Sequence, residues 1–264
     1  MAFETILFEV RDQIAWVTMN RPESMNAINR LMARELVEAC KQVEDDAGIR
    51  VAIFTGAGER AFSAGMDLKE RAETSFSPIE RRNQKLSQTI HTQSRAIGAL
   101  TKPTIAAILG YCVGGGLEMA LACDMRVAAE DAKLGLTEVR RGLIPGAGGT
   151  QRLPRLVGEA KAKELMYIGD PISAEEAYRI GLANRLVPAG EALTAARQMG
   201  QTIASRAGVA LRYIQQAVDR GLNTTLEEGL HIEADLFAKV FQTEDVREGV
   251  EAFINKRQPN FRHR

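Results

Sequence analysis

The chain lacks an excess of charge of either sign. Its 264 residues include 34 Lys and Arg against 34 Asp and Glu, so the formal net charge is zero. Duplex DNA and anionic membranes are bound mainly by basic surfaces. The balance therefore argues against bulk electrostatic capture of either partner, although a local cluster could still hold a small anion. With 45% hydrophobic and 26% charged residues, the composition is that of a folded globular protein.

Cysteine is scarce, and no long uninterrupted apolar run is present. Cys40, Cys112 and Cys123 are far apart, with no CxxC and no histidine at ligand spacing. This argues against a disulfide framework and a zinc site, and it favours a reducing compartment, the cytoplasm. The first residues do not form a signal peptide. Thr104–Cys123 is largely apolar, but it contains three successive glycines and Glu118, so we do not expect it to span a membrane.

Strand and helix patterns alternate in the first two thirds of the chain and become helical afterwards. This order predicts an α/β fold, with a core over residues 1–200 that holds the active site and a helical C-terminal region over 201–264, in one continuous protein. A hairpin is expected at Thr5–Val10 and Ile14–Asn20, a helix at Asn26–Glu44 and a loop at Ala57–Asp67. Further strands are expected at Ile49–Thr55, Thr104–Leu109, Asp124–Ala129, Lys133–Gly135 and Asn184–Val187, and a further helix at Leu117–Cys123.

Two segments match the sequence patterns of well-known motifs in part. Gly56–Ala61 matches the GxGxxG/A dinucleotide fingerprint, which requires a helix to start there, whereas the following residues are typical of a loop. Ala61–Gly65 is similar to a nucleophile elbow around Ser63. A triad would also need an oriented histidine, and the three histidines lie in helical patterns or in the tail. We therefore interpret Gly56–Ala61 as a tight turn and Ser63 as a serine without a catalytic role.

A glycine triplet between a predicted strand and a predicted helix is more informative. Gly114, Gly115 and Gly116 follow the strand and precede Glu118. Helix N-termini present unpaired N–H groups and a partial positive charge, and glycine allows a ligand to approach them. The corner therefore suits an oxyanion on the Gly115 N–H. Alternatively, the glycines only permit close packing, and Glu118 only complements the helix dipole.

A second carboxylate, Glu138, precedes the glycine-rich segment Gly142–Pro154. Two glutamates on converging elements would suit general acid–base chemistry, with one activating a water and the other delivering a proton. Spacing alone leaves open whether Glu118 and Glu138 face each other or are two unrelated glutamates at helix starts.

Four motifs in order give the chain a family resemblance over nearly its whole length. They are Asn20-Arg-Pro with Asn26-Ala27, Ala61–Lys69, Gly114–Glu118 with Ala122-Cys-Asp124, and Ile144–Leu153. The chain is identified by them as similar to the crotonase (enoyl-CoA hydratase/isomerase) superfamily. The resemblance implies a spiral of ββα units, with C-terminal helices that form homotrimers, often paired as dimers of trimers.

The resemblance also implies a substrate and a site. The substrate would be an acyl-coenzyme A thioester whose carbonyl oxygen is held by the backbone N–H groups of Met66 and Gly115. Glu118 and Glu138 would hold the water, and Glu138 would exchange the proton at C2. No metal and no cofactor is implied, since coenzyme A is part of the substrate. The implied substrate contacts are Met25, Ala27, Ala64, Asp67, Leu68, Lys69, Gly114 and Gly146.

The expected function is therefore that of an enoyl-CoA hydratase, with two glutamates favouring hydration over sister chemistries. A Δ3,Δ2-enoyl-CoA isomerase, or a hydratase of a branched, cyclic or carboxylated enoyl-CoA, remains an alternative. Met66 departs from the small residue common in its motif and could narrow the acyl site. Glu70–Gln88 is expected to shape the acyl-tail pocket; its arginines suggest a polar acyl group or simply a solvated helix face.

An RNA-binding homologue of the hydratases is the alternative from another class. Asp67–Ala72 resembles that branch, whose RNA-binding helix is rich in lysine. The matching segment Asn26–Arg50 carries four basic side chains, at Arg30, Arg34, Lys41 and Arg50, against five acidic ones. Its balance is 4 − 5 = −1, so nucleic acid is not the expected partner.

Overall fold

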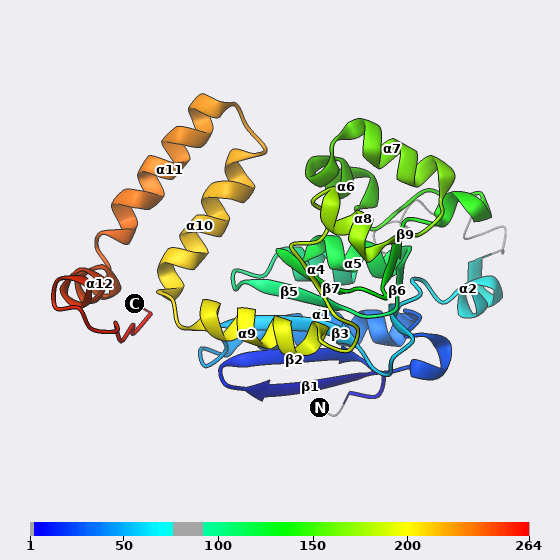
Figure 1. Ribbon diagram of the computed structural model, residues 1–264, viewed down its shortest axis with the longest axis horizontal. Coiled ribbons are helices and arrows are strands. Elements are labelled where there is room, and N and C mark those ends of the chain that lie inside the picture. The colour runs from blue at the N-terminus through cyan, green and yellow to red at the C-terminus, as the bar shows by residue number, and fades with distance from the viewer. Residues whose placement is uncertain (1–2, 76–91, 264) are drawn as a thin grey trace.

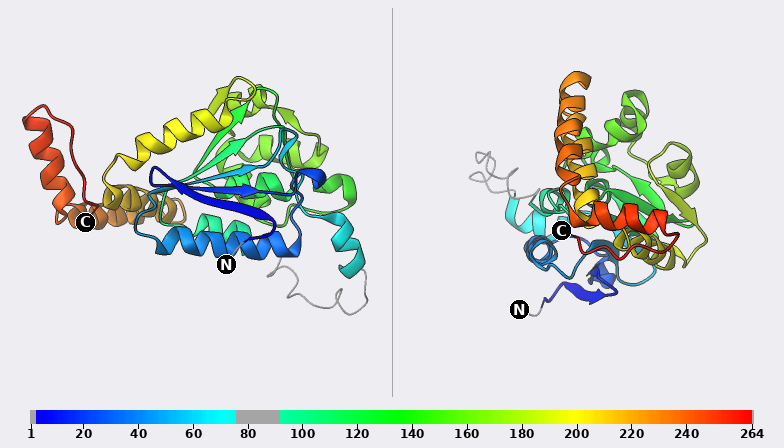
Figure 2. Two further views of the ribbon diagram at one scale, coloured as in Figure 1. Left: turned by 90° about the horizontal axis from the view of Figure 1, so that it is seen from below. Right: turned by 90° about the vertical axis from the view of Figure 1, so that its left-hand side faces the viewer.

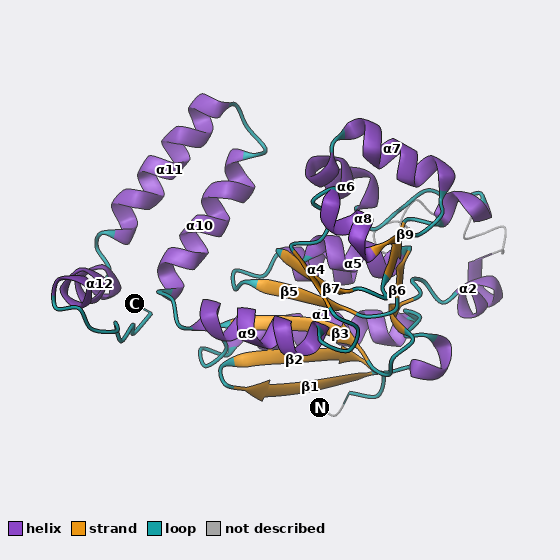
Figure 3. Ribbon diagram, in the orientation of Figure 1, coloured by secondary structure: helices purple, strands orange, loops and turns teal. Residues whose placement is uncertain are grey.

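A six-stranded sheet forms the centre of the molecule. The computed structural model describes residues 3–75 and 92–263. Strands β1 and β2 form an antiparallel hairpin, as predicted, and the later strands extend it in parallel (Figure 3). In sheet order the strands are β1 (Ile6–Arg11), β2 (Ile14–Met19), β3 (Val51–Gly56), β5 (Thr104–Ile108), β7 (Met125–Ala129) and β10 (Arg185–Val187).

A second, smaller sheet lies beside the first. Its strands are, in order, β4 (Ala61–Ser63), β6 (Tyr111–Val113), β8 (Lys133–Gly135) and the antiparallel β9 (Ile172–Ser173). Three times the chain passes from a strand of the first sheet to one of the second and then into a helical segment. This repeated ββα path confirms the predicted fold class.

Helices cover both faces of the six-stranded sheet, as Figure 2 shows for α9 (Ala192–Ala204, yellow) and α1 (Arg30–Asp45, blue). The side chains of β3 alternate between two cores: Ile53 packs with Met199 of α9, whereas Phe54 packs in the core that contains Leu36 of α1. Because both faces are buried, β3 begins with four successive apolar residues instead of an alternating pattern, and it is buried along its whole length. The helices α4 (Thr92–Gly98) and α5 (Gly115–Ala122) contribute to the second core.

The region before α1 corrects the sequence prediction. The helix expected from Asn26 begins only at Arg30, because Asn29 caps it by accepting a hydrogen bond from the Met32 N–H at 2.8 Å. Met25 and Asn26 instead have positive φ values of 53°. The buried Asn26 amide donates to the carbonyls of Ala57 and Ala61 and thereby ties this turn to β4.

The loop expected over Ala57–Asp67 is also wrong in part, because it contains β4. The strands β4, β6 and β9 are only two or three residues long, too short to produce a periodic pattern. The helix expected at Leu117–Cys123 begins two residues earlier, at Gly115. Of the segment Glu70–Gln88, expected to shape the acyl-tail pocket, residues 76–88 lie outside the described residues.

The remaining helices include a group next to the small sheet and three at the C-terminal end. Of the described helices, none is long and apolar enough to cross a membrane. In Figure 1, the last three helices extend away from the sheets as a separate arm, which begins directly after α9. The helices not yet bounded are η1 (Pro22–Ser24), α2 (Leu68–Ser75), η3 (Glu138–Arg141), α6 (Gly149–Val157), α7 (Glu159–Ile168), α8 (Ala174–Arg179), α10 (Gly208–Gly221), α11 (Leu226–Val240) and α12 (Glu244–Ile254).

Candidate active site

Two backbone corners meet where neighbouring strands of the small sheet end. Gly65 follows β4 and Gly114 follows β6, and these strands pair in parallel. Gly65 has a φ of +86°, and a Cβ added there would lie 2.8 Å from the Val113 carbonyl oxygen and 2.9 Å from the Gly115 nitrogen. Such contacts are closer than carbon can make, so only glycine lets the two corners approach each other.

The N–H groups of Met66 and Gly115 lie at this junction. A Cβ built on Gly115 would be 3.5 Å from the Met66 nitrogen, so the two groups are neighbours. Ile28 bonds to both residues flanking Met66, donating to the Gly65 oxygen at 2.7 Å and accepting from the Asp67 N–H at 2.9 Å. In a parallel bridge this pattern points the N–H of Met66 away from Ile28. Within the described chain neither N–H has an acceptor, and together they can hold one oxyanion.

Glu118 is anchored on α5 next to these donors. Its side chain is 3% exposed, and its Oε1 accepts the N–H groups of Ala147 at 2.6 Å and Gly149 at 2.8 Å. Burial raises the pKa of Glu118, while these hydrogen bonds and the N–H of Gly146 oppose the rise. The predicted site residue Gly146 therefore lies beside this carboxylate.

Glu138 starts the short helix η3 and faces the same corner. A Cβ on Gly114 would lie 3.4 Å from Glu138 Oε1, so the glycine leaves room for the carboxyl group. Its Oε2 is buried and has no hydrogen-bond partner among the described residues. Burial, and then the charge of Glu118, raise the pKa of Glu138 to about 7.

The two carboxyl groups thus differ in environment. Glu118 is held by two backbone donors that favour its ionised form, whereas the Oε2 of Glu138 has no donor among the described residues, and burial and the charge of Glu118 disfavour the anion of Glu138. Near neutral pH the pair can hold one proton, placed on Glu138. One base and one acid beside an oxyanion site is an arrangement suited to adding or removing water.

The predicted coenzyme A contacts cluster around the first corner. Ala64 donates its N–H to the Met25 carbonyl at 2.9 Å, and the Ala27 carbonyl accepts from Arg21. Asp67 forms an ion pair with Arg21 at 2.9 Å, and its Oδ1 accepts the N–H groups of Lys69 and Glu70. The Asp67 carboxylate is therefore engaged in holding the start of α2 and the turn at Ala27.

Leu68 and Lys69 follow on the exposed side of α2, with their side chains open to solvent. The structure brings them to the same side of the molecule as the Met25–Ala27 turn, through the bridge between Ile28 and Met66. Their contact with a substrate stays a prediction.

Sequence reasoning missed the residues that hold the first glutamate in place. Ala147 and Gly149 donate to Glu118 across 29 and 31 residues, and Arg152 donates to the Ala147 carbonyl at 3.0 Å. A Cβ on Gly149 would lie 3.0 Å from Glu118 Oε1 and 2.8 Å from Pro145. The glycine-rich composition of this loop was the signal, but composition does not identify which N–H points at which carboxylate.

The structure explains the two segments that match a dinucleotide fingerprint and a nucleophile elbow in part. Gly56 ends β3, and a turn and β4 follow instead of the helix that a dinucleotide site needs. The hydroxyl of Ser63 is fully buried; it donates to the Asn26 carbonyl at 2.8 Å and accepts from the Gly65 N–H at 3.1 Å. It therefore shapes the first corner rather than acting as a nucleophile. In the part of the chain that is described, no group of three or more His, Cys, Asp and Glu is arranged to hold a metal ion.

The chain is similar to known proteins over nearly its whole length. The family model described as enoyl-CoA hydratase/isomerase matches residues 9–264. A crotonyl-CoA hydratase of Syntrophomonas wolfei is 42% identical over 262 residues, covering 99% of both chains. A short-chain-enoyl-CoA hydratase of Clostridium acetobutylicum is 39% identical, over 98% of this chain and 97% of its own. The solved structure of an enoyl-CoA hydratase from Bacillus anthracis superposes with a TM-score of 0.94 at 40% identity, covering 99% of this chain and all of that one.

Proposed function

Since the chain belongs to the enoyl-CoA hydratase/isomerase family, we propose that it adds water reversibly across the 2,3 double bond of a trans-2-enoyl-CoA. The observation that carries the proposal is a pair of glutamates, Glu118 buried and Glu138 partly buried, beside two N–H groups that have no acceptor in the described part of the chain. The names of the relatives agree with it, and short unbranched substrates such as crotonyl-CoA are the first to test.

The chemistry follows from the placement of these groups. The N–H groups of Met66 and Gly115 hold the thioester oxygen and stabilise the negative charge that develops there as water attacks C3. The water oxygen bonds to C3, one of its protons passes to Glu118, and Glu138 gives its own proton to C2. Exchange with solvent then returns the pair to its starting protonation. Both protons come from water and carboxyl groups, so no metal or redox cofactor is required, and coenzyme A arrives with the substrate.

The direct test is the loss of the conjugated thioester absorbance when purified protein meets crotonyl-CoA. We expect rapid bleaching and formation of the 3-hydroxyacyl product, identified by mass as the addition of one water. Rates measured with a panel of longer, branched, cyclic and carboxylated enoyl-CoAs define the range of substrates. Migration of a 3,4 double bond without water uptake would instead identify an isomerase and contradict hydration as the main activity.

The pH dependence of kcat/KM should report the two carboxyl groups of the free enzyme. Glu138 must carry a proton to act as the acid, so hydration should fall as the pH rises through about 7. Glu118 must be ionised to act as the base, so the rate should also fall at low pH, below its raised pKa. A bell-shaped profile with an alkaline limb near pH 7 is expected. A rate that stays flat from pH 6 to 9 would contradict this assignment of the acid.

We also propose that the C-terminal arm mediates assembly into a homotrimer or a dimer of trimers. Its helices expose a series of large apolar side chains that a lone chain would leave in water. They are Ile214, Val218, Leu222, Leu226, Leu230, Phe237, Phe241, Val250, Phe253 and Ile254.

The three free cysteines are all buried, which is consistent with a cytoplasmic location.

A single charge on the arm should weaken this assembly. Phe253 is 85% exposed, so Phe253→Asp is tolerated by the isolated chain but places a carboxylate in an apolar interface. We expect sedimentation velocity to show a trimer or hexamer for the unchanged protein and about a tenfold or greater weakening of assembly for the variant. The matched control Phe253→Leu keeps an apolar surface and should assemble normally. A wild-type monomer at micromolar concentration would contradict the proposal.

A further inference from the structure

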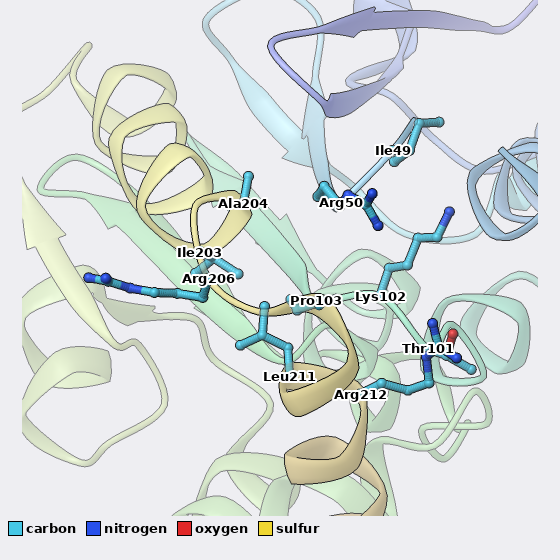
Figure 4. A pocket seen from close by; sticks show the side chains of 11 residues that line it. Ile49, Arg50, Thr101, Lys102, Pro103, Ile203, Ala204, Arg206, Leu211 and Arg212 are labelled. Carbon is cyan, nitrogen blue, oxygen red and sulfur yellow. The ribbon is translucent and has the colours of Figure 1, made fainter. Parts of the chain in front are cut away.

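A small pocket lies at the opposite end of the sheet from the candidate active site. It has a volume of about 30 Å³, room for roughly two water molecules or a small oxyanion. Its walls come from the segments that precede β3 and β5, from the end of α9 and from the start of α10 (Figure 4). The active-site corners instead follow the ends of β4 and β6, so the pocket is separate from the catalytic groups and independent of the hydration chemistry.

Four cations line this pocket without matching acids. Arg50, Lys102, Arg206 and Arg212 belong to it, and no carboxylate does. Among the described residues none of the four has a carboxylate oxygen within 4.0 Å. In Figure 4, Arg206 extends to the opposite side from the other three. The charges that can act together are therefore those of Arg50, Lys102 and Arg212.

The nearest acids are occupied elsewhere. The Glu44 carboxylate accepts the N–H and hydroxyl of Thr101 at 3.0 and 2.6 Å, and Asp46 accepts the Gly48 N–H at 2.7 Å. Asp245 accepts two N–H groups of the C-terminal tail, from Arg262 and His263. These carboxylates partly offset the cations at longer range, but none of them enters the pocket.

The cations are held in place although they repel one another. Burial is the largest cause that lowers the pKa of Arg50 and of Lys102, and the neighbouring cations lower both further, Arg212 acting on Arg50 and both arginines acting on Lys102. The Lys102 ammonium is fixed by the carbonyls of Val43 and Asp46, at 2.5 and 2.6 Å. Helix α10 is held against the same loop because Gln215 donates to the Leu100 carbonyl at 2.8 Å. The pocket thus keeps like charges together in the folded chain.

One polar group of a residue that lines this pocket has no partner among the described residues. The Nε of Arg50 is buried and makes no hydrogen bond with any described residue. A buried donor without an acceptor is uncommon, because water or a ligand normally satisfies it. The apolar lining from Ile49, Pro103 and Leu211 excludes part of the solvent and strengthens any charge–charge contact made inside.

We propose that this pocket binds a phosphate group, bridged by Arg50 and Arg212. A tetrahedral dianion offers several acceptor oxygens to the two guanidinium groups and supplies the negative charge that the pocket lacks. Arg50 directly precedes β3 of the six-stranded sheet, and Arg212 lies on α10 of the C-terminal arm. A phosphate bound to both arginines therefore links the arm to the sheet. Free inorganic phosphate and the phosphate group of a larger phosphate monoester both offer these oxygens and this charge to the two arginines.

Calorimetric titration of the full chain with inorganic phosphate, at constant ionic strength held with chloride, tests the site. We expect one phosphate per chain at millimolar or lower concentration, and about a tenfold or greater loss of affinity in Arg50→Gln and in Arg212→Gln. Arg220→Gln removes the same charge from the same helix outside the pocket and should bind phosphate normally. Unchanged hydratase activity and thermal unfolding would show that the variants are folded.

A second titration, with glycerol 3-phosphate, identifies the source of the group. Binding at least as tight as that of phosphate, and equally sensitive to Arg212→Gln, would assign the pocket to a monoester. Binding of phosphate alone would assign it to the free ion. The proposal is overturned if neither probe binds at millimolar concentration, or if both bind the two pocket variants as well as they bind the unchanged chain. A failure here would leave the crotonyl-CoA assay unaffected.

Discussion

Glu138→Gln is expected to lower kcat for hydration of crotonyl-CoA by about 10²–10⁴-fold, because the amide has no proton of suitable acidity to deliver to C2. The substitution keeps the size of the side chain, and the room beside Gly114 accommodates it. KM should change much less than kcat, because the thioester oxygen is still held by backbone N–H groups. Initial rates over a range of crotonyl-CoA concentrations, at the pH optimum, measure both quantities.

The stability of the same variant provides a control against unfolding. The pKa of Glu138 is raised to about 7, so the folded chain binds this proton more tightly than the unfolded chain. Stability is thus lost as the pH rises toward 7, and at pH 8 the partly buried anion of Glu138 destabilises the fold. Removing it should raise the free energy of unfolding at pH 8 by about 1–2 kcal/mol, after allowance for solvent screening. A variant that is slow and also less stable than the unchanged protein would not support the acid role.

Glu118→Gln should be comparably slow for a different reason. The amide oxygen can still accept the N–H groups of Ala147 and Gly149, so the loop keeps its position while the base is lost. Its pH profile distinguishes the two roles, because the residual activity should lose its acidic limb, whereas that of Glu138→Gln should lose its alkaline limb. Near wild-type rates in both variants would contradict the paired-carboxylate mechanism.

The accuracy of the sequence predictions depended on how local the determining interactions are. The hairpin β1–β2 and the buried strand β3 were predictable because each strand has six residues with a clear pattern. The start of α1 was placed too early because Ile28 continues the apolar stripe, although the chain there turns through positive φ values. Only the Asn29 cap, a side-chain interaction, ends the turn and starts the helix.

The residues of the candidate site were likewise predictable only where they lie close together in the sequence. Gly115 and Glu118 lie within four residues at one helix start, so their association could be predicted from the sequence. The approach of Glu138 could not, because it depends on the pairing of β8, which was predicted, with β6, a three-residue strand that was not. The donors to Glu118 come from 29 and 31 residues away, and a spacing of that length carries no information about contact.

Gly115→Pro is expected to lower kcat/KM by about 10²–10³-fold, because it deletes one donor to the thioester oxygen and nothing else that the helix needs. Gly115 is the first residue of α5, where proline is tolerated because this N–H has no partner within the helix. The preceding Gly114, at φ 55° and ψ −129°, lies at the mirror image of the extended region that proline prefers before it, which glycine adopts freely.

Gly115→Ala is the matched control for this substitution. It keeps the N–H, and its Cβ would be 3.5 Å from the Met66 nitrogen, an ordinary contact distance. The alanine variant should therefore lose much less activity than the proline variant, and both should unfold near the temperature of the unchanged protein. If the two variants differed by less than about tenfold in kcat/KM, the Gly115 N–H would not be the donor that stabilises the oxyanion, and the free N–H of Met66 would have to act without it.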